Sequence, residues 1–293
     1  MVTTRRPVCC VLVLALAVAA LGAACAAAAG PEPEGGDAAW RLDPLWDDGR
    51  AEVCSYRVAW PRYGETYSGS ALLVLVKEPW APELAVKADT PRADGFEVLK
   101  LNHGRDVRTG IYEYHQMASV FVRRDDGRLV KMATTSSEAC GITTAQLVGG
   151  RLTTHSYFDG QGERQSAWSG GLPEDGLPAM LRELVAGEVP AEVEVFPSLL
   201  VPRFPELEPG RWRLVRREIE ATDAEGAPVA AVEMLLSRGE EWRRYVFARQ
   251  LPYQMLEHSA SDGTRYRLAR CERLDYWRLN RPGDEEWLPA DLR

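Results

Sequence analysis

The sequence predicts an all-β fold: a mainly antiparallel, strongly curved sheet or open barrel with one short amphipathic helix around residues 177–186. Apolar and polar residues alternate with a period of two over many segments, as side chains do on a half-buried strand. Turn residues, above all Asp-Gly and other glycine pairs, separate these segments every 8 to 15 residues. The 9 Trp, 10 Tyr and 25 Gly also suit an antiparallel sheet with many turns.

The first residues are expected to be an export signal that is not part of the fold. Arg5 and Arg6 precede an uncharged apolar stretch at 8–21, which is too short for a typical membrane span of about 20 residues. The following Gly22-Ala23-Ala24-Cys25 resembles the bacterial lipobox, in which the cysteine is lipidated, although Gly22 stands where that motif prefers Leu. We therefore expect a signal peptide at 1–24 and lipidation at Cys25. Ordinary cleavage at an Ala-x-Ala site within 24–29 is the alternative.

Residues 25–39 are expected to be a flexible tether between a membrane anchor and a single β-domain at 40–293. The tether is rich in Ala, Gly and Pro, so it has little apolar surface with which to order itself. Removing residues 1–24 changes the formal net charge from −8 to −10, because only Arg5 and Arg6 are lost. A domain with this negative charge is not attracted to an anionic membrane surface. A lipid on Cys25 would therefore have to hold it at the membrane.

Three cysteines remain in the predicted domain: Cys54, Cys140 and Cys271. An exported protein meets an oxidising compartment, so one disulfide from two of the three, plus one free thiol, is expected. The residues themselves leave the pair open, and three buried thiols are the alternative. Cys54 and Cys271 lie in alternating segments near the two ends of the domain, whereas Cys140 lies in a loop-like stretch.

The predicted strands follow one another with short turns. The clearest hairpin joins 111–122 to 129–132 through Asp125-Asp126-Gly127-Arg128, where glycine tolerates the positive φ that such turns require. Further strands are predicted at 53–60, 70–76, 151–158, 211–221, 229–236, 241–248, 253–258 and 264–276.

The one predicted helix at 177–186 interrupts this pattern. Its apolar residues recur at helical spacing, Pro178 suits the first turn, Gly187 can end it, and Asp175 is placed to cap its start. The apolar stripe that these residues form along the helix should plug one end or cover one face of the curved sheet. A Pro-rich connection at 197–209 then separates the N-terminal strands from the C-terminal ones.

Several structural motifs of the chain occur together in one kind of protein. They lie at 99–102, 110–112, 172–181, 250–257, 266–268 and 275–277. On these segments the chain resembles uncharacterised exported bacterial proteins and envelope lipoproteins of unknown function that contain a strongly curved antiparallel sheet. The likeness covers most of residues 46–280, and it implies a half-barrel like that of lipoprotein carriers but no activity.

No catalytic, metal or cofactor residue is predicted. The sequence has no phosphate-binding glycine loop, nucleophile elbow or His-Glu-x-x-His motif. The four histidines, His103, His115, His155 and His258, are widely spaced, so a zinc site would need an accident of tertiary structure. Arginines alternate with aromatic residues in the C-terminal half, but glutamates share those segments, so cross-strand ion pairs are expected rather than nucleic-acid binding.

These observations predict a non-enzymatic cell-envelope lipoprotein that binds an apolar ligand or a protein partner. It would be exported and anchored through Cys25 on the periplasmic or outer surface of a membrane, or else be periplasmic. Aromatic and aliphatic residues on the concave face of a curved sheet could hold such a ligand. The alternatives are a secreted hydrolase acting on envelope glycans or esters, and a structural interaction module.

Overall fold

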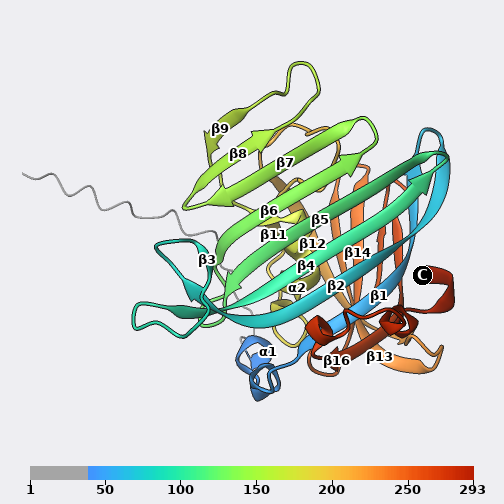
Figure 1. The fold of residues 1–293 in the computed structure, drawn as a ribbon. Helices are drawn as coiled ribbons and strands as arrows, with labels where there is room; N and C mark the ends of the chain where they lie inside the picture. Colours follow the sequence, from blue (N-terminus) through green and yellow to red (C-terminus); the bar gives the residue numbers. More distant parts are fainter. Residues whose placement is uncertain (1–38) are drawn as a thin grey trace, which may run out of the picture.

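The computed structural model describes residues 39–293 and confirms the all-β prediction. Most of this part of the chain is β-strand, in one large and mainly antiparallel sheet that is not closed (Figure 1). The predicted signal peptide, Cys25 and nearly all of the predicted tether lie outside the described residues.

The strands follow the predicted alternation, with longer hairpins than expected in the N-terminal half. The turn at Gly127, whose φ is 74°, joins β5 to β6 as predicted. The strands are β1 (Ala51–Arg62), β2 (Glu65–Ala81), β3 (Val86–Lys87), β4 (Phe96–Thr109), β5 (Tyr112–Arg123), β6 (Leu129–Glu138), β7 (Gly141–Val148), β8 (Arg151–His155), β9 (Arg164–Ala167), β10 (Leu172–Pro173), β11 (Glu192–Phe196), β12 (Gly210–Thr222), β13 (Pro228–Arg238), β14 (Glu241–Ala248), β15 (Met255–Ala260) and β16 (Arg265–Leu274).

The chain enters the sheet at its centre. Strand β1 pairs with β2 on one side and with the last strand, β16, on the other, so the two halves of the chain extend in opposite directions from it. The order is β10-β11-β12-β13-β14-β15-β16-β1-β2-β4-β5-β6-β7-β8-β9, and only the short β10–β11 pairing is parallel.

The two edge strands, β9 and β10, are consecutive in sequence and are joined only by residues 168–171. Five Cα–Cα steps reach at most roughly 17 Å, so the two edges of this sheet must come close to each other. That constraint explains the strong curvature. Figure 1 shows the C-terminal strands β12 and β14 lying behind the N-terminal strands β4 and β5.

The predicted helix is shorter than expected. Only α2 (Leu177–Met180) is α-helical, and it lies between the 3-10 helices η2 (Glu174–Gly176) and η3 (Leu181–Leu184). The predicted stripe of Leu177, Met180, Leu181, Leu184 and Val185 is buried in the core, so the interpretation of that face was correct. A second α-helix, α1 (Ala39–Leu42), packs near η3 and was not predicted.

The prediction that Asp175 caps the start of this helix was wrong. The N-cap of α2 is Gly176, which has no side-chain cap bond, and the Asp175 carboxylate bonds elsewhere. Because η2 and α2 are short and lie inside a curved sheet, burial of the apolar stripe holds them in place rather than helix length or capping.

The C-terminal segment covers part of the outer face of the sheet. Its 3-10 helices η4 (Tyr276–Arg278), η5 (Asp284–Trp287) and η6 (Ala290–Leu292) follow β16. Tyr276 and Trp287 pack on a small second core that includes Val53 and Val74. The central strands are therefore buried on both faces.

Candidate ligand-binding site

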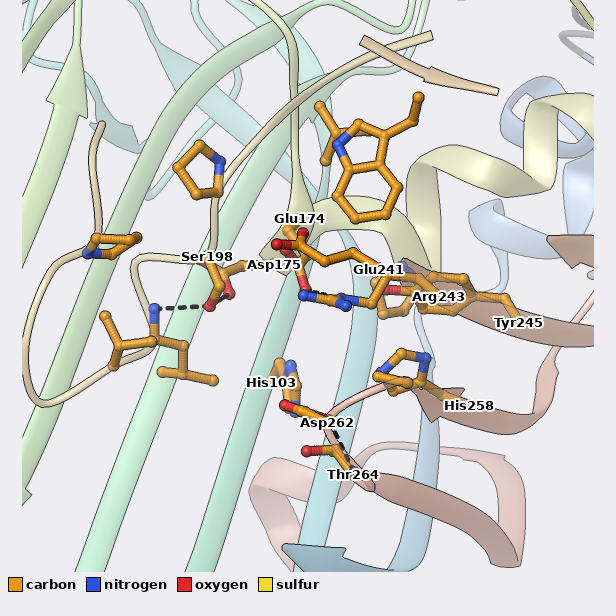
Figure 2. A pocket seen from close by; sticks show the side chains of 18 of the residues that line it. His103, Glu174, Asp175, Ser198, Glu241, Arg243, Tyr245, His258, Asp262 and Thr264 are labelled. Atoms are coloured by element: carbon orange, nitrogen blue, oxygen red, sulfur yellow. Dashed lines mark hydrogen bonds and ion pairs between the residues drawn. The ribbon is translucent and has the colours of Figure 1, made fainter. Parts of the chain in front are cut away.

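A cavity of about 600 Å³ lies on the concave side of the sheet, in the size range of small-molecule sites (Figure 2). Strands from both halves of the chain line it, together with η2 and residues 197–209. Its lining side chains are those of Trp60, His103, Arg105, Glu174, Asp175, Pro178, Val195, Pro197, Ser198, Leu200, Val201, Pro205, Glu206, Glu208, Pro209, Trp212, Arg238, Glu241, Arg243, Tyr245, Met255, His258, Ala260, Asp262, Thr264 and Tyr266.

One part of the wall is apolar and aromatic. Trp212, Val195 and Met255 are buried in the main core and also face the cavity. Trp60 and Tyr245 add flat aromatic surfaces from strands β1 and β14. These side chains offer a ligand an apolar surface.

The Pro-rich segment 197–209, which we call the strap, forms another part of the wall. Polar side chains on the inner face of β5–β7 bind its backbone carbonyls. Thr134 Oγ1 donates to the carbonyl of Leu199 over 3.1 Å, and Thr143 Oγ1 donates to that of Pro202 over 2.7 Å. The predicted connection is therefore a bound structural element, and its carbonyls give these two buried threonines their hydrogen-bond partners.

Asp175 fixes the beginning of the strap. Its carboxylate accepts hydrogen bonds from Ser198 Oγ at 2.5 Å and from the backbone N–H of Leu199 at 2.8 Å. Burial raises the pKa of Asp175 to about 6, and the two hydrogen bonds oppose that rise.

Glu174, the preceding residue, forms an ion pair inside the cavity. Arg243 Nε lies 2.7 Å from Glu174 Oε1, and the guanidinium also lies over the Trp212 ring. Figure 2 shows Glu174, Arg243, His103 and His258 gathered around the same space. The cavity rim is acidic and exposed: Glu206, Glu208, Glu241 and Asp262 lie there, with Arg238 bonded to Glu241.

Arg105, on β4, is the other arginine of the inner wall. Its Nε donates to Gln116 Oε1 at 2.9 Å and its Nη1 donates to the Tyr266 hydroxyl at 3.2 Å. The guanidinium centre lies 4.8 Å from the centroid of the Trp60 ring. Gln116 in turn donates to Ser136 and to the carbonyl of Leu200 on the strap. A polar network therefore ties this part of the cavity wall to the strap.

His103 and His258 are brought together at the cavity although 155 positions separate them in the sequence. Burial lowers the pKa of His103 to about 3 and that of His258 to about 4, so both are neutral at pH 7. His103 Nε2 lies 3.1 Å from the Tyr266 hydroxyl, and His258 Nδ1 lies 3.2 Å from the carbonyl of Arg244. Among residues 39–293, no hydrogen bond joins either of them to a serine, so a Ser-His pair for hydrolysis is not formed here.

The other two histidines lie apart from the cavity. His115 is exposed and bonds Asp106 at 2.7 Å, and His155 is exposed at the end of β8.

Cys54 and Cys271 form a disulfide between the adjacent strands β1 and β16, and Cys140 is an exposed free thiol. Within the described part of the chain, Glu52, Cys54 and Cys271 are the only group of three side chains with ligand atoms close enough for one metal ion. The disulfide already uses both sulfurs of that group.

The cavity's polar residues gave little signal in the sequence. Arg105 and Gln116 stand in alternating segments, where a polar residue normally faces water, and here they face inward under the strap. The interpretation of the C-terminal arginines holds for Arg244, which pairs across strands with Glu233 and Glu257, whereas Arg243 faces the cavity.

No helix among residues 39–293 has the length and apolar character needed to cross a membrane. Comparisons of the chain with protein-family models, with curated proteins and with solved structures find no match.

Proposed function

We propose that this protein is a non-enzymatic cell-envelope lipoprotein whose β-domain binds a small ligand in the concave cavity. The observation that carries the proposal is the cavity itself, which has about 600 Å³ of space, an aromatic wall and a cluster of converging polar groups. A domain whose concave face were filled solidly by side chains would offer no such site.

The polar lining refines the kind of ligand. Trp212, Val195 and Met255 suit an apolar body, whereas Arg105, His103 and Tyr266 suit hydrogen-bonding groups. A ligand with both characters fits this lining better than a pure hydrocarbon, because the buried Nδ1 of His103 has no hydrogen-bond partner among the described residues and a hydrocarbon would offer it none. The export signal and the lipid on Cys25 would place this binding domain at a membrane surface, where amphiphilic molecules are abundant.

Native mass spectrometry of protein purified from the membrane fraction tests the binding function. We expect a bound small molecule that leaves on denaturation, and we expect Ala260→Trp to lower its occupancy because Ala260 lines the cavity and is buried. Ala167→Trp, on the exposed edge strand β9, is the matched control. A ligand-free wild-type protein that also binds no added amphiphile would refute the function.

Mass spectrometry of the mature N-terminus tests the anchor separately. A chain that begins at Cys25 and carries acyl groups supports it. An unmodified chain that begins after Cys25 contradicts the anchor but leaves the cavity's function intact.

A further inference from the structure

Four arginines are buried in the described part of the chain, and three of them face a carboxylate. Arg41 pairs with Glu183, Arg182 with Glu52, and Arg124 with Asp47 and Glu97. The fourth, Arg105, is only 9% exposed, and among residues 39–293 no carboxylate lies within 4 Å of its nitrogens. It is also the only one of the four that lines the cavity.

The groups that hydrogen-bond Arg105 are neutral. Gln116 and Tyr266 accept its hydrogen bonds, together with the carbonyl of Leu200 at 3.5 Å. A buried charge is costly unless an opposite charge accompanies it, so this guanidinium lacks the partner that the other three have.

The remaining charges of the inner wall are already engaged. Arg243 and Glu174 neutralise each other at 2.7 Å. Asp175 directs both carboxylate oxygens to the strap, to Ser198 and Leu199, and forms no ion pair with Arg105, although the two charges attract each other at longer range.

From this arrangement we infer that the cavity receives an anionic amphiphile, whose carboxylate or phosphate group binds Arg105 and whose apolar body lies against Trp212 and Met255. The inference rests on the proposed ligand-binding function and names its chemical class. A guanidinium presents parallel N–H donors to the oxygens of such anions, and charge-assisted bonds of this kind are stronger than neutral ones.

The charge distribution also orients the ligand. The rim acids Glu206, Glu208 and Asp262 repel an anionic group at the entrance, whereas Arg105 attracts it at the buried end of the site. The anionic head should therefore lie inside and the tail toward the rim. Since the rim residues are exposed, salt should screen this repulsion and speed entry.

The test measures the binding of decanoate, decyl phosphate and decanol to the whole domain by titration calorimetry. For the wild type we expect at least one anion to bind about tenfold or more tightly than the alcohol, because the tails are equal and only the head group differs. The tighter of the two anions identifies a carboxylate or a phosphate ligand.

Variants locate the head group. In Arg105→Met the preference for the anion over decanol should fall to about one, and Arg105→Lys should keep part of it. Arg244→Met is the matched control, because Arg244 is partly buried, pairs with Glu233 and does not line the cavity. Should Arg105→Met fail to fold, the wild-type comparison and Arg105→Lys still decide the question.

The outcomes separate the two proposals. Equal binding of all three probes by the wild type overturns the anion inference and leaves the ligand-binding function standing. An unchanged anion preference in Arg105→Met also overturns it, because the head group would then bind elsewhere. Binding of none of the probes counts against the anion inference, and when the purified protein also carries no ligand it removes the proposed function too.

Discussion

Arg182 and Glu52 form an ion pair in the interior, with Nη2 2.6 Å from Oε1 and side chains only 3% and 4% exposed. The pair joins η3 to the central strand β1, and Arg182 also donates to the carbonyl of Pro252 at 2.9 Å. It therefore fastens the short helical segment to the sheet that surrounds it.

Arg182→Met should lower the free energy of unfolding by about 3–5 kcal/mol, because it leaves the Glu52 carboxylate buried without its partner. Urea denaturation measures the change. The double variant with Glu52→Gln should cost less than the sum of the two single changes. Arg57→Met is the control: its pair with Asp291 is exposed, so its loss should cost under about 1 kcal/mol. Equal costs for the two arginines would contradict the prediction.

The Cys54–Cys271 disulfide links residues 217 positions apart. Replacing both cysteines with Ala should lower the free energy of unfolding by about 4 kcal/mol, because the crosslink restricts the unfolded chain. Reductant should shift the wild-type midpoint in the same direction and leave the double variant unchanged. Cys140→Ser removes the exposed thiol and should have little effect. A reductant-insensitive wild type would show that the bond contributes nothing to stability.

Asp175 should make the protein more stable as the pH falls from about 6 to about 4. Its pKa is about 6 in the folded protein and about 4 in an unfolded chain, so the folded state binds more protons in that window. The contribution is complete below about pH 4 and is lost as the pH rises through 6, with a ceiling of about 3 kcal/mol.

Asp175→Asn should abolish this pH-dependent contribution to stability, and unfolding free energies measured at pH 4.5 and 7.5 would show the loss. Asp262→Asn, at an exposed residue of the cavity rim, is the control. Identical pH profiles for Asp175→Asn and the wild type would rule out this role for the buried carboxyl.

His258 should act in the opposite sense. Its pKa is about 4 when folded and about 6.5 when unfolded, so its contribution is complete above about pH 6.5 and is lost as the pH falls toward 4. His258→Gln should flatten that part of the stability profile. His155→Gln, at an exposed site, should not. If His258→Gln keeps the wild-type slope, the folded histidine titrates normally.

The sheet was predictable because a period of two and a turn residue are local properties of the chain. The hairpin at Gly127 was visible in this way, and the helical spacing of the buried stripe from Leu177 to Val185 is a local property as well. The cavity depends instead on pairings between distant segments. His103 and Tyr266 meet only because β16 pairs with β1, β1 with β2, and β2 with β4.

The role of Asp175 shows the same limit. An acidic residue before a helix predicts a cap, and only the path of the strap reveals that this carboxylate bonds Ser198 and Leu199 instead. Arg105 looks like an ordinary outward-facing residue of an alternating strand, and the lack of a carboxylate beside it is a property of three-dimensional packing.

Because the link from β9 to β10 is short, the gap between the two edges of this open sheet has a limited width. Neighbouring strands are spaced by about 4.8 Å, so roughly 17 Å of chain bridges little more than three strand positions. The gap between the two edges cannot widen far without breaking backbone hydrogen bonds of the edge residues. One of these bonds runs from the Trp168 N–H to the carbonyl of Gly150. The connectivity of the chain thus limits the volume that the sheet can enclose. Part of a ligand much larger than the cavity would therefore remain outside it.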